Sequence, residues 1–196
     1  LFLVSVIIAV ILISIEGFLP YYFIKDKDFY RGTGDILTFS NDYKLLYVLQ
    51  GVGSKELLKA DFDVAVVDPD DSRLTNKNLI SLQKQGKKII AYLSIGEAED
   101  YRKYWKEDWC LRNPSFIDDE NPDWHGNYKV RFWDRQWQDI IYERLDELVA
   151  MGYDGVYLDV IDSYEYYRDR GYIFAKIEMI NFVYSISWRA KKAKED

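Results

Sequence analysis

The chain has 196 residues, 48% of them hydrophobic and 30% charged, and this balance excludes a disordered or low-complexity protein. One cysteine excludes an internal disulfide framework, and one histidine argues against a zinc cluster. The net charge of -7 and the pI near 4.9 argue against a nucleic-acid partner, because a phosphate-binding surface needs clustered Lys and Arg, and they allow a neutral or cationic ligand.

Residues 1–19 are predicted to form a signal or anchor helix, because Leu1–Ile15 carries no charge. Its length fits a signal-peptide core of about 7–15 residues and falls short of the about 20 that a membrane span needs. Ser14–Gly17 is a poor cleavage site, which favours an uncleaved anchor over a cleaved signal peptide. A buried helix is the third interpretation, and no polar face in the run supports it. Either targeting segment predicts an extracytoplasmic protein, secreted or anchored to the membrane.

Residues 20–43 are interpreted as a linker because they are aromatic, charged and rich in turn residues. Residues 44–196 are predicted to form one domain of alternating strands and helices. Continuous apolar runs such as VAVVD and GVYLD are typical of strands buried on both faces, as in parallel sheets. The predicted strands are Leu45–Leu49, Val64–Asp68, Lys88–Ile95, Lys129–Trp133 and Gly155–Asp159, and the predicted helices are Asn76–Gly86, Gln136–Met151 and Ile173–Lys194.

The strand and helix order predicts βαβ units, in an open sheet or a closed barrel. Gly51-x-Gly53 lacks the third glycine of a dinucleotide-binding loop, so that class of open sheet is unsupported. Polar residues recur instead at the carboxyl ends of the predicted strands, the active-site edge of a (β/α)8 TIM barrel. They are Asp68, Ser94 through Glu99, Asp134, Asp159 and Asp162. At about 31 residues a unit, the predicted fold is an α/β, incomplete TIM barrel of about five βα units.

The segment AYLSIGEAEDYR brings two glutamates and Arg102 into one loop after the third predicted strand. Gly96 allows a sharp turn there. Arg102 is a candidate to hold a carboxylate in a fixed position. The alternative is a solvated acidic loop at the start of a helix, where Glu and Asp are common.

The segment NPDWHGNYKVRFWD contains the loop dipeptides N-P and G-N. Trp124 and Trp133 are candidates to stack on a sugar ring, and the alternative is that they pack the barrel. His125 precedes a predicted strand, so we expect it at the surface and assign it no catalytic triad.

The segment GYDGVYLDVIDSYEYY ends a predicted buried strand at Asp159, with Asp162 three residues later. Burial of a carboxylate beside an apolar strand costs free energy unless the carboxylate has partners, and a role in binding or catalysis would account for its presence there. Two close acids can also differ in pKa, as acid/base hydrolysis requires. The alternative is helix capping by Asp162, with loop amides satisfying Asp159.

In order and spacing, these three segments, with Trp137-Gln138 after the second, resemble glycoside hydrolase family 114, the endo-α-1,4-polygalactosaminidase-like TIM-barrel proteins. The resemblance runs from Leu45 to the end of the chain. It implies a glycosidase that cleaves α-1,4-linked galactosamine polymer by carboxylate acid/base catalysis. No motif requires a cofactor or a metal. The expected partners are this polysaccharide, which as a polycation suits an acidic protein, and the membrane through the N-terminal segment.

The resemblance also implies the site. The family's catalytic Asp matches Asp159, which we expect to be the nucleophile or base. The family's second carboxylate, a later Glu, is expected beyond residue 196. The expected substrate-binding residues are Asp68, Tyr92, Glu99, Trp133, Tyr157 and Asp162. Two alternatives stay open: a glycan-binding barrel without activity, and a hydrolase of another polysaccharide on the same scaffold.

Overall fold

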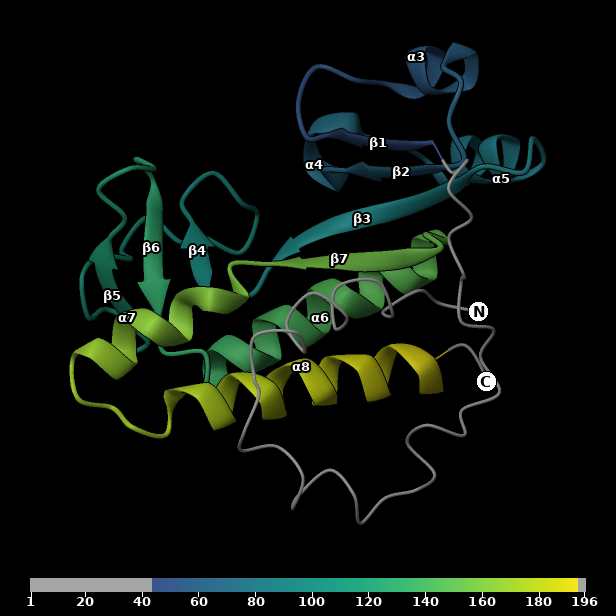
Figure 1. Cartoon of the computed structure of the whole chain (residues 1–196). Coiled ribbons are helices and arrows are strands. Elements are labelled where there is room, and N and C mark those ends of the chain that lie inside the picture. The colour runs from purple at the N-terminus through teal and green to yellow at the C-terminus, as the bar shows by residue number, and fades with distance from the viewer. Residues whose placement is uncertain (1–43, 194–196) are drawn as a thin grey trace.

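The computed structural model describes residues 44–193, and its centre is a four-stranded parallel sheet (Figure 1). The strands lie in the order β1-β2-β3-β7, so each helical connection returns the chain to a parallel neighbour. Their bounds are β1 Leu45–Val48, β2 Val64–Val67, β3 Lys88–Ser94 and β7 Gly155–Asp159. These four agree with the predicted strands, and the predicted α/β class with a parallel sheet is confirmed.

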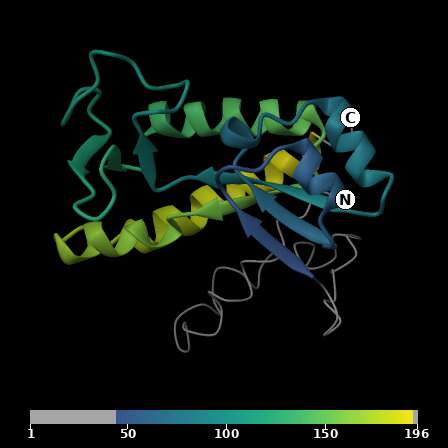
Figure 2. The same cartoon turned by 90° about the horizontal axis from the view of Figure 1, so that it is seen from above.

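Two long helices cover one face of this sheet. In Figures 1 and 2, α6 (Arg135–Met151) and α8 (Ala175–Lys192) run side by side along β3 and β7. They bury Trp137, Ile141 and Leu145 from α6 and Phe182 and Ile186 from α8. The shorter helices are α3 Ser54–Lys59, α4 Pro69–Ser72, α5 Asn76–Gln83 and α7 Tyr164–Asp169, with a 3-10 turn, η1, at Ile161–Ser163.

The sequence spacing also predicts one apolar stripe on this helix, made of Ile177, Ile180, Val183 and Ile186, and the buried face of α8 differs from it in part. Met179 and Phe182 are buried, whereas Ile177 is 43% exposed. Apolar residues lie on more than one side of this helix, and its packing against α6 and α7 decides which of them face the core.

The predicted strand Lys129–Trp133 does not join the parallel sheet. It overlaps β6 (Asn127–Val130), which pairs antiparallel with β4 (Glu97–Glu99) and β5 (Ile117–Glu120) in a separate small sheet. The described residues therefore contain four parallel strands rather than the predicted five. A short strand in which apolar and charged residues alternate fits either kind of sheet, so the partner strands decide its place. Asp134, expected at a strand end, is the N-cap of α6 and accepts a 2.8 Å hydrogen bond from the Gln136 amide.

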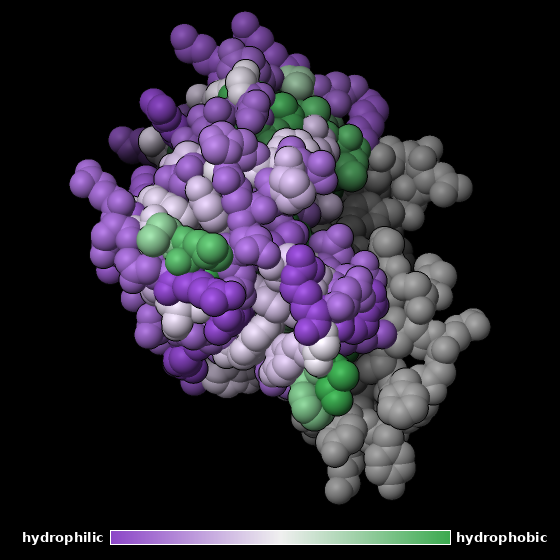
Figure 3. All heavy atoms as spheres, turned by 90° about the vertical axis from the view of Figure 1, so that its left-hand side faces the viewer, coloured by the Kyte–Doolittle hydropathy of each residue, from purple (hydrophilic) through white to green (hydrophobic). Residues whose placement is uncertain are grey.

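The small sheet is an insertion between β3 and α6, held by a buried charge. Glu97 is 2% exposed and accepts hydrogen bonds from Lys129 and from Asn121. Figure 3 shows the end of the molecule that carries this insertion, where the surface is mostly hydrophilic with small, separate apolar patches. The Glu97 bonds hold the small sheet together, and the buried side chains of Phe116, Ile117 and Val130 attach the insertion to the main hydrophobic core.

The four parallel strands form an open sheet with β1 and β7 at its edges, so the expected barrel is not closed within residues 44–193. Among these residues, no helix is long and apolar enough to cross a membrane. The predicted signal or anchor helix at 1–19 and the predicted linker at 20–43 lie outside the described residues.

Candidate active site

Two neighbouring strands deliver the first pair of site residues. β3 and β7 are in register with Ser94 opposite Asp159, and the Tyr92 hydroxyl donates a 2.7 Å hydrogen bond to Asp159 Oδ2. Tyr92 is 8% exposed. Burial raises the pKa of its hydroxyl, and the bond to Asp159 raises the pKa further. Tyr92 is therefore a protonated donor to Asp159 over the whole physiological pH range.

The backbone after Asp159 is sharply turned. Val160 has φ 58° and ψ 32°, the left-handed region that β-branched residues rarely occupy. The Asp159 carbonyl accepts a 3.1 Å hydrogen bond from the Ile95 amide. Gly96 packs directly against this turn, and a Cβ there would overlap the Val160 carbonyl oxygen. The predicted need for glycine at position 96 thus comes from close approach of the two strand-end loops.

Arg102 joins two of the predicted carboxylates. It donates from Nη1 to Asp68 Oδ1 at 2.8 Å and from Nε to Glu99 Oε2 at 2.6 Å. Burial lowers the pKa of Arg102, but its hydrogen bonds to Asp68 and Glu99 outweigh this and raise the pKa overall. The predicted clamp is thereby confirmed, with one guanidinium shared between carboxylates from two strand ends.

Both carboxylates have further bonds. Asp68 is the N-cap of α4 and accepts from the Asp70 amide at 2.8 Å, and Glu99 accepts from the Tyr101 hydroxyl at 2.7 Å. Glu99 is 4% exposed, so the alternative of a solvated acidic loop is wrong for this residue. Asp68 and Glu99 are fixed, paired charges at the mouth of the sheet.

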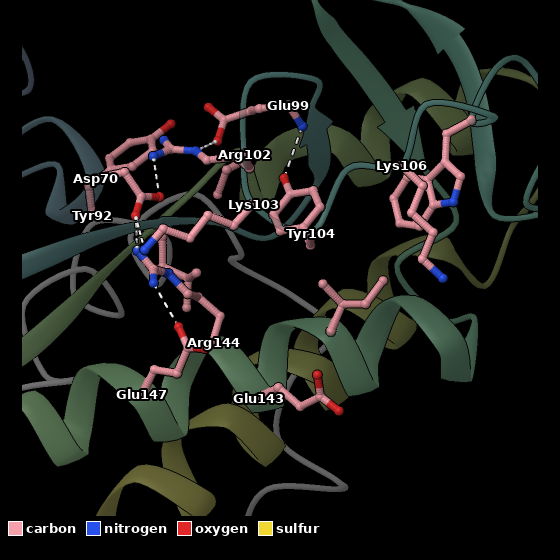
Figure 4. A pocket seen from close by; sticks show the side chains of 14 residues that line it. Asp70, Tyr92, Glu99, Arg102, Lys103, Tyr104, Lys106, Glu143, Arg144 and Glu147 are labelled. Atoms are coloured by element: carbon pink, nitrogen blue, oxygen red, sulfur yellow. Dashed lines mark hydrogen bonds and ion pairs between the residues drawn. The ribbon is translucent and has the colours of Figure 1, made fainter.

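A cavity of about 450 Å³ adjoins Arg102, between α6 and the loop after β4 (Figure 4). Arg102 and Tyr104 line one side of it, and Glu143, Arg144 and Glu147 of α6 line the other. Arg144 is bonded to Asp70 Oδ1 at 2.7 Å and to Glu147 at 2.8 Å. The α6 residues of this cavity were not predicted, because charged positions on a helix surface carry no sequence signal that separates a cavity from solvent.

The remaining predicted site residues lie in different settings. Tyr157 stacks on Tyr92 with ring centroids 6.5 Å apart. Asp162 is exposed in η1 and forms no side-chain cap there. Trp133 packs against Tyr167 and Tyr172 with centroids 4.7 and 4.5 Å away. Within residues 44–193, no hydrogen bond or ring contact joins Trp133 or Asp162 to the Tyr92–Asp159 pair.

His125 is exposed on the insertion, as expected, with Nδ1 2.5 Å from Glu120 Oε1. The carboxylates Asp68 and Asp159, by contrast, lie where parallel strands of the main sheet end. Such placement is typical of α/β barrel enzymes, whose active sites occupy this edge.

The comparison with protein families identifies the family of the chain. The model of glycoside-hydrolase family GH114 matches residues 32–195, and the chain belongs to that family. An uncharacterized protein of Methanocaldococcus jannaschii is 37% identical over 180 residues, which are 86% of this chain and 52% of that protein. An uncharacterized protein of Thermotoga maritima is 36% identical over 159 residues, which are 77% of this chain and 49% of that one. The chain spans about half the length of the curated relatives it matches.

Solved structures show the same fold. The crystal structure of Aspergillus fumigatus Ega3 in complex with galactosamine is 25% identical, with a TM-score of 0.58, over 76% of this chain and 54% of that chain. The glycoside hydrolase domain of PelA from Pseudomonas aeruginosa is 20% identical, with a TM-score of 0.53, over 73% of this chain and 53% of that one.

Proposed function

We propose that this protein hydrolyses a galactosamine-containing polysaccharide of the α-1,4-linked type, with Asp159 as nucleophile or base. The observation that carries the proposal is the setting of Asp159. It ends β7, it is half-buried, and within residues 44–193 its carboxylate has one hydrogen-bond partner, Tyr92. Its Oδ1 is therefore available to a substrate, whereas Asp68 and Glu99 are held by Arg102.

The charges of this edge support an amino-sugar substrate. Asp159 and Asp162 lie at or after the end of β7, and the whole chain carries a net charge of -7. An acidic surface attracts a polycation and raises its local concentration. The likeness to Ega3, whose crystal structure contains galactosamine, supports the same substrate class. Asp162, which is exposed after β7, would bind the sugar, and the half-buried ring of Tyr157 would contact its apolar face.

Hydrolysis needs a second carboxyl group as acid. Glu99 is poorly suited, because Arg102 and Tyr101 occupy both of its oxygens. In this proposal the acid comes from outside the described residues, as the family resemblance implies.

The test is release of reducing ends from α-1,4-linked galactosamine oligosaccharides by the full-length protein. Asp159→Asn should reduce the rate on the order of a thousandfold or more while binding is kept. Asp169→Asn, an exposed carboxylate on α7, is the matched control and should leave the rate unchanged. Retained activity in Asp159→Asn would exclude the assignment. Binding without cleavage by the unaltered protein would indicate a glycan-binding barrel, and cleavage of only neutral glycans a different hydrolase.

We also propose that Leu1–Ile15 directs the chain to the membrane, so that the domain works on the extracytoplasmic side. The support is the uncharged apolar run alone. A reporter enzyme that is active only after export, fused after residue 43, should be active in cells. Its inactivity, with normal expression, would contradict the proposal.

A further inference from the structure

We propose that the cavity between α6 and the loop after β4 is a second carbohydrate subsite, which binds one amino-sugar unit of the polymer outside the sheet mouth. The inference rests on the proposed function for its ligand class. The cavity, of about 450 Å³, is within the range of small-molecule sites and is open to a sugar unit of a longer chain.

One wall of the cavity offers an apolar surface. Trp109 and Tyr104 line it from the loop, together with Leu93 of β3 and Ile140 of α6. Trp109 is held by edge contacts with Trp105 and Phe116, each with ring centroids 5.4 Å apart. A fixed aromatic residue loses little conformational freedom on binding, and the C–H face of a pyranose can pack against it.

Two charges in the cavity are left without an opposite charge. Arg102, Lys103 and Arg144 are paired with Asp70, Glu99 and Glu147. In the described part of the chain, Glu143 has no ion pair, and Lys106 contacts only the Trp109 ring, at 6.0 Å from its centroid. Figure 4 shows Glu143 on α6 and Lys106 on the far side of the opening. A free carboxylate and a free ammonium therefore border the same space.

These charges select the ligand chemistry. The ammonium group of an amino sugar can pair with Glu143, and its hydroxyl oxygens can accept hydrogen bonds from Lys106. A neutral sugar would leave Glu143 without a partner, and an acidic sugar would place a second negative charge beside Glu143. The cavity thus favours a galactosamine unit with a free amine over its N-acetylated form.

The position of the cavity connects it with the candidate active site. Tyr92 and Glu99 line the cavity, and the Tyr92 hydroxyl reaches Asp159. A polymer with one unit in this cavity has its neighbouring units close to the strand-end carboxylates. Because the two binding events share one chain, occupancy of the cavity should strengthen binding of long polymers and leave cleavage of short ones unchanged.

The test measures binding and cleavage with Glu143→Gln, which keeps the side-chain shape and removes the charge. Glu107→Gln is the matched control, because Glu107 is exposed on the same loop and does not line the cavity. Binding is measured by titration calorimetry in the Asp159→Asn background. Glu143→Gln should weaken binding of long galactosamine oligomers about tenfold, raise KM for the cleaved polymer and leave kcat on a short oligomer unchanged. Fully N-acetylated oligomers should bind equally to Glu143→Gln and its parent.

If Glu143→Gln binds and cleaves long oligomers as the Glu107→Gln control does, the subsite is excluded and the proposed function still stands. A loss of kcat on short oligomers in Glu143→Gln would also exclude the subsite, because this loss would place Glu143 in the active site. If the unaltered protein neither binds nor cleaves galactosamine oligomers, the proposed function fails and the subsite fails with it.

Discussion

Gly96 packs directly against the backbone of Val160 at the edge of the sheet where the candidate active site lies. A Cβ on residue 96 would approach the Val160 carbonyl oxygen to well under 3.0 Å, and it would also overlap the Ser163 side chain. Val160 holds its left-handed backbone immediately after Asp159. The loop after β3 thus fixes the direction in which Asp159 leaves the sheet, and backbone strain beside a candidate catalytic group is a recurrent feature of active sites.

Replacement Gly96→Ala should lower the free energy of unfolding by about 2–3 kcal/mol, because the obstacle is backbone rather than a flexible side chain. Urea unfolding followed by tryptophan fluorescence measures this. Gly53→Ala is the control, since its Cβ would meet only the mobile end of Glu56, and it should cost less than about 1 kcal/mol. Equal costs for the two variants would show that the loops can separate freely.

Replacement Tyr92→Phe removes the donor to Asp159 and keeps the ring. A hydrogen bond to a charged group is worth about 1.5–3 kcal/mol, so kcat on galactosamine oligomers should fall about ten- to a hundredfold. Tyr128→Phe, on the insertion, removes a hydroxyl with no hydrogen bond among residues 44–193 and should have no effect. If Tyr92→Phe raises only KM, Tyr92 serves the substrate and does not position Asp159.

Stability should fall in alkaline solution because of buried tyrosines. Burial raises the pKa of Tyr153 to about 12, whereas an unfolded chain has a Tyr pKa of about 10. The contribution is therefore complete below about pH 10 and is lost as the pH rises toward 12, amounting to roughly 3 kcal/mol. The Tyr153 hydroxyl has no hydrogen-bond partner in the described part of the chain.

Replacement Tyr153→Phe should therefore keep or slightly increase stability at pH 7, and it should make the loss of stability between pH 10 and 12 smaller. Urea unfolding at a series of pH values measures both effects. An unchanged slope in that range would mean that Tyr153 ionises as readily in the folded protein as in the unfolded chain.

The strands could be predicted where the sequence pattern is compatible with only one kind of sheet position. Val64–Val67 is buried at every residue, and such a run at this length is compatible with few structures other than a central parallel strand. In Lys129–Trp133, the apolar residues Val130 and Phe132 alternate with charged ones, a pattern that fits either kind of sheet, and β6 pairs antiparallel with β4 and β5 rather than with a parallel strand. Strand pairing is a property of the fold, so the error arose where local pattern and long-range pairing differ.

The residues of the candidate site also fall into those that the sequence could indicate and those that it could not. Asp159 and Gly96 could be singled out because each occupies a costly local position, a carboxylate at a buried strand end and a sharp turn. Glu143 and Lys106 could not, because each resembles an ordinary surface charge. Only the packing of α6 beside the loop after β4 makes them neighbours.

By itself, the sequence determined the alternating strands and helices, the position of acidic residues at strand ends and the resemblance to a glycosidase family, since these depend on local spacing and residue type. Only the tertiary structure decided that β6 leaves the parallel sheet, that Arg102 bridges Asp68 and Glu99, and that Tyr92 holds Asp159. The Arg102–Asp68 and Tyr92–Asp159 bonds join residues 34 and 67 positions apart, and the place of β6 is a choice between strand partners. Their energies depend on distances that exist only after the chain has folded.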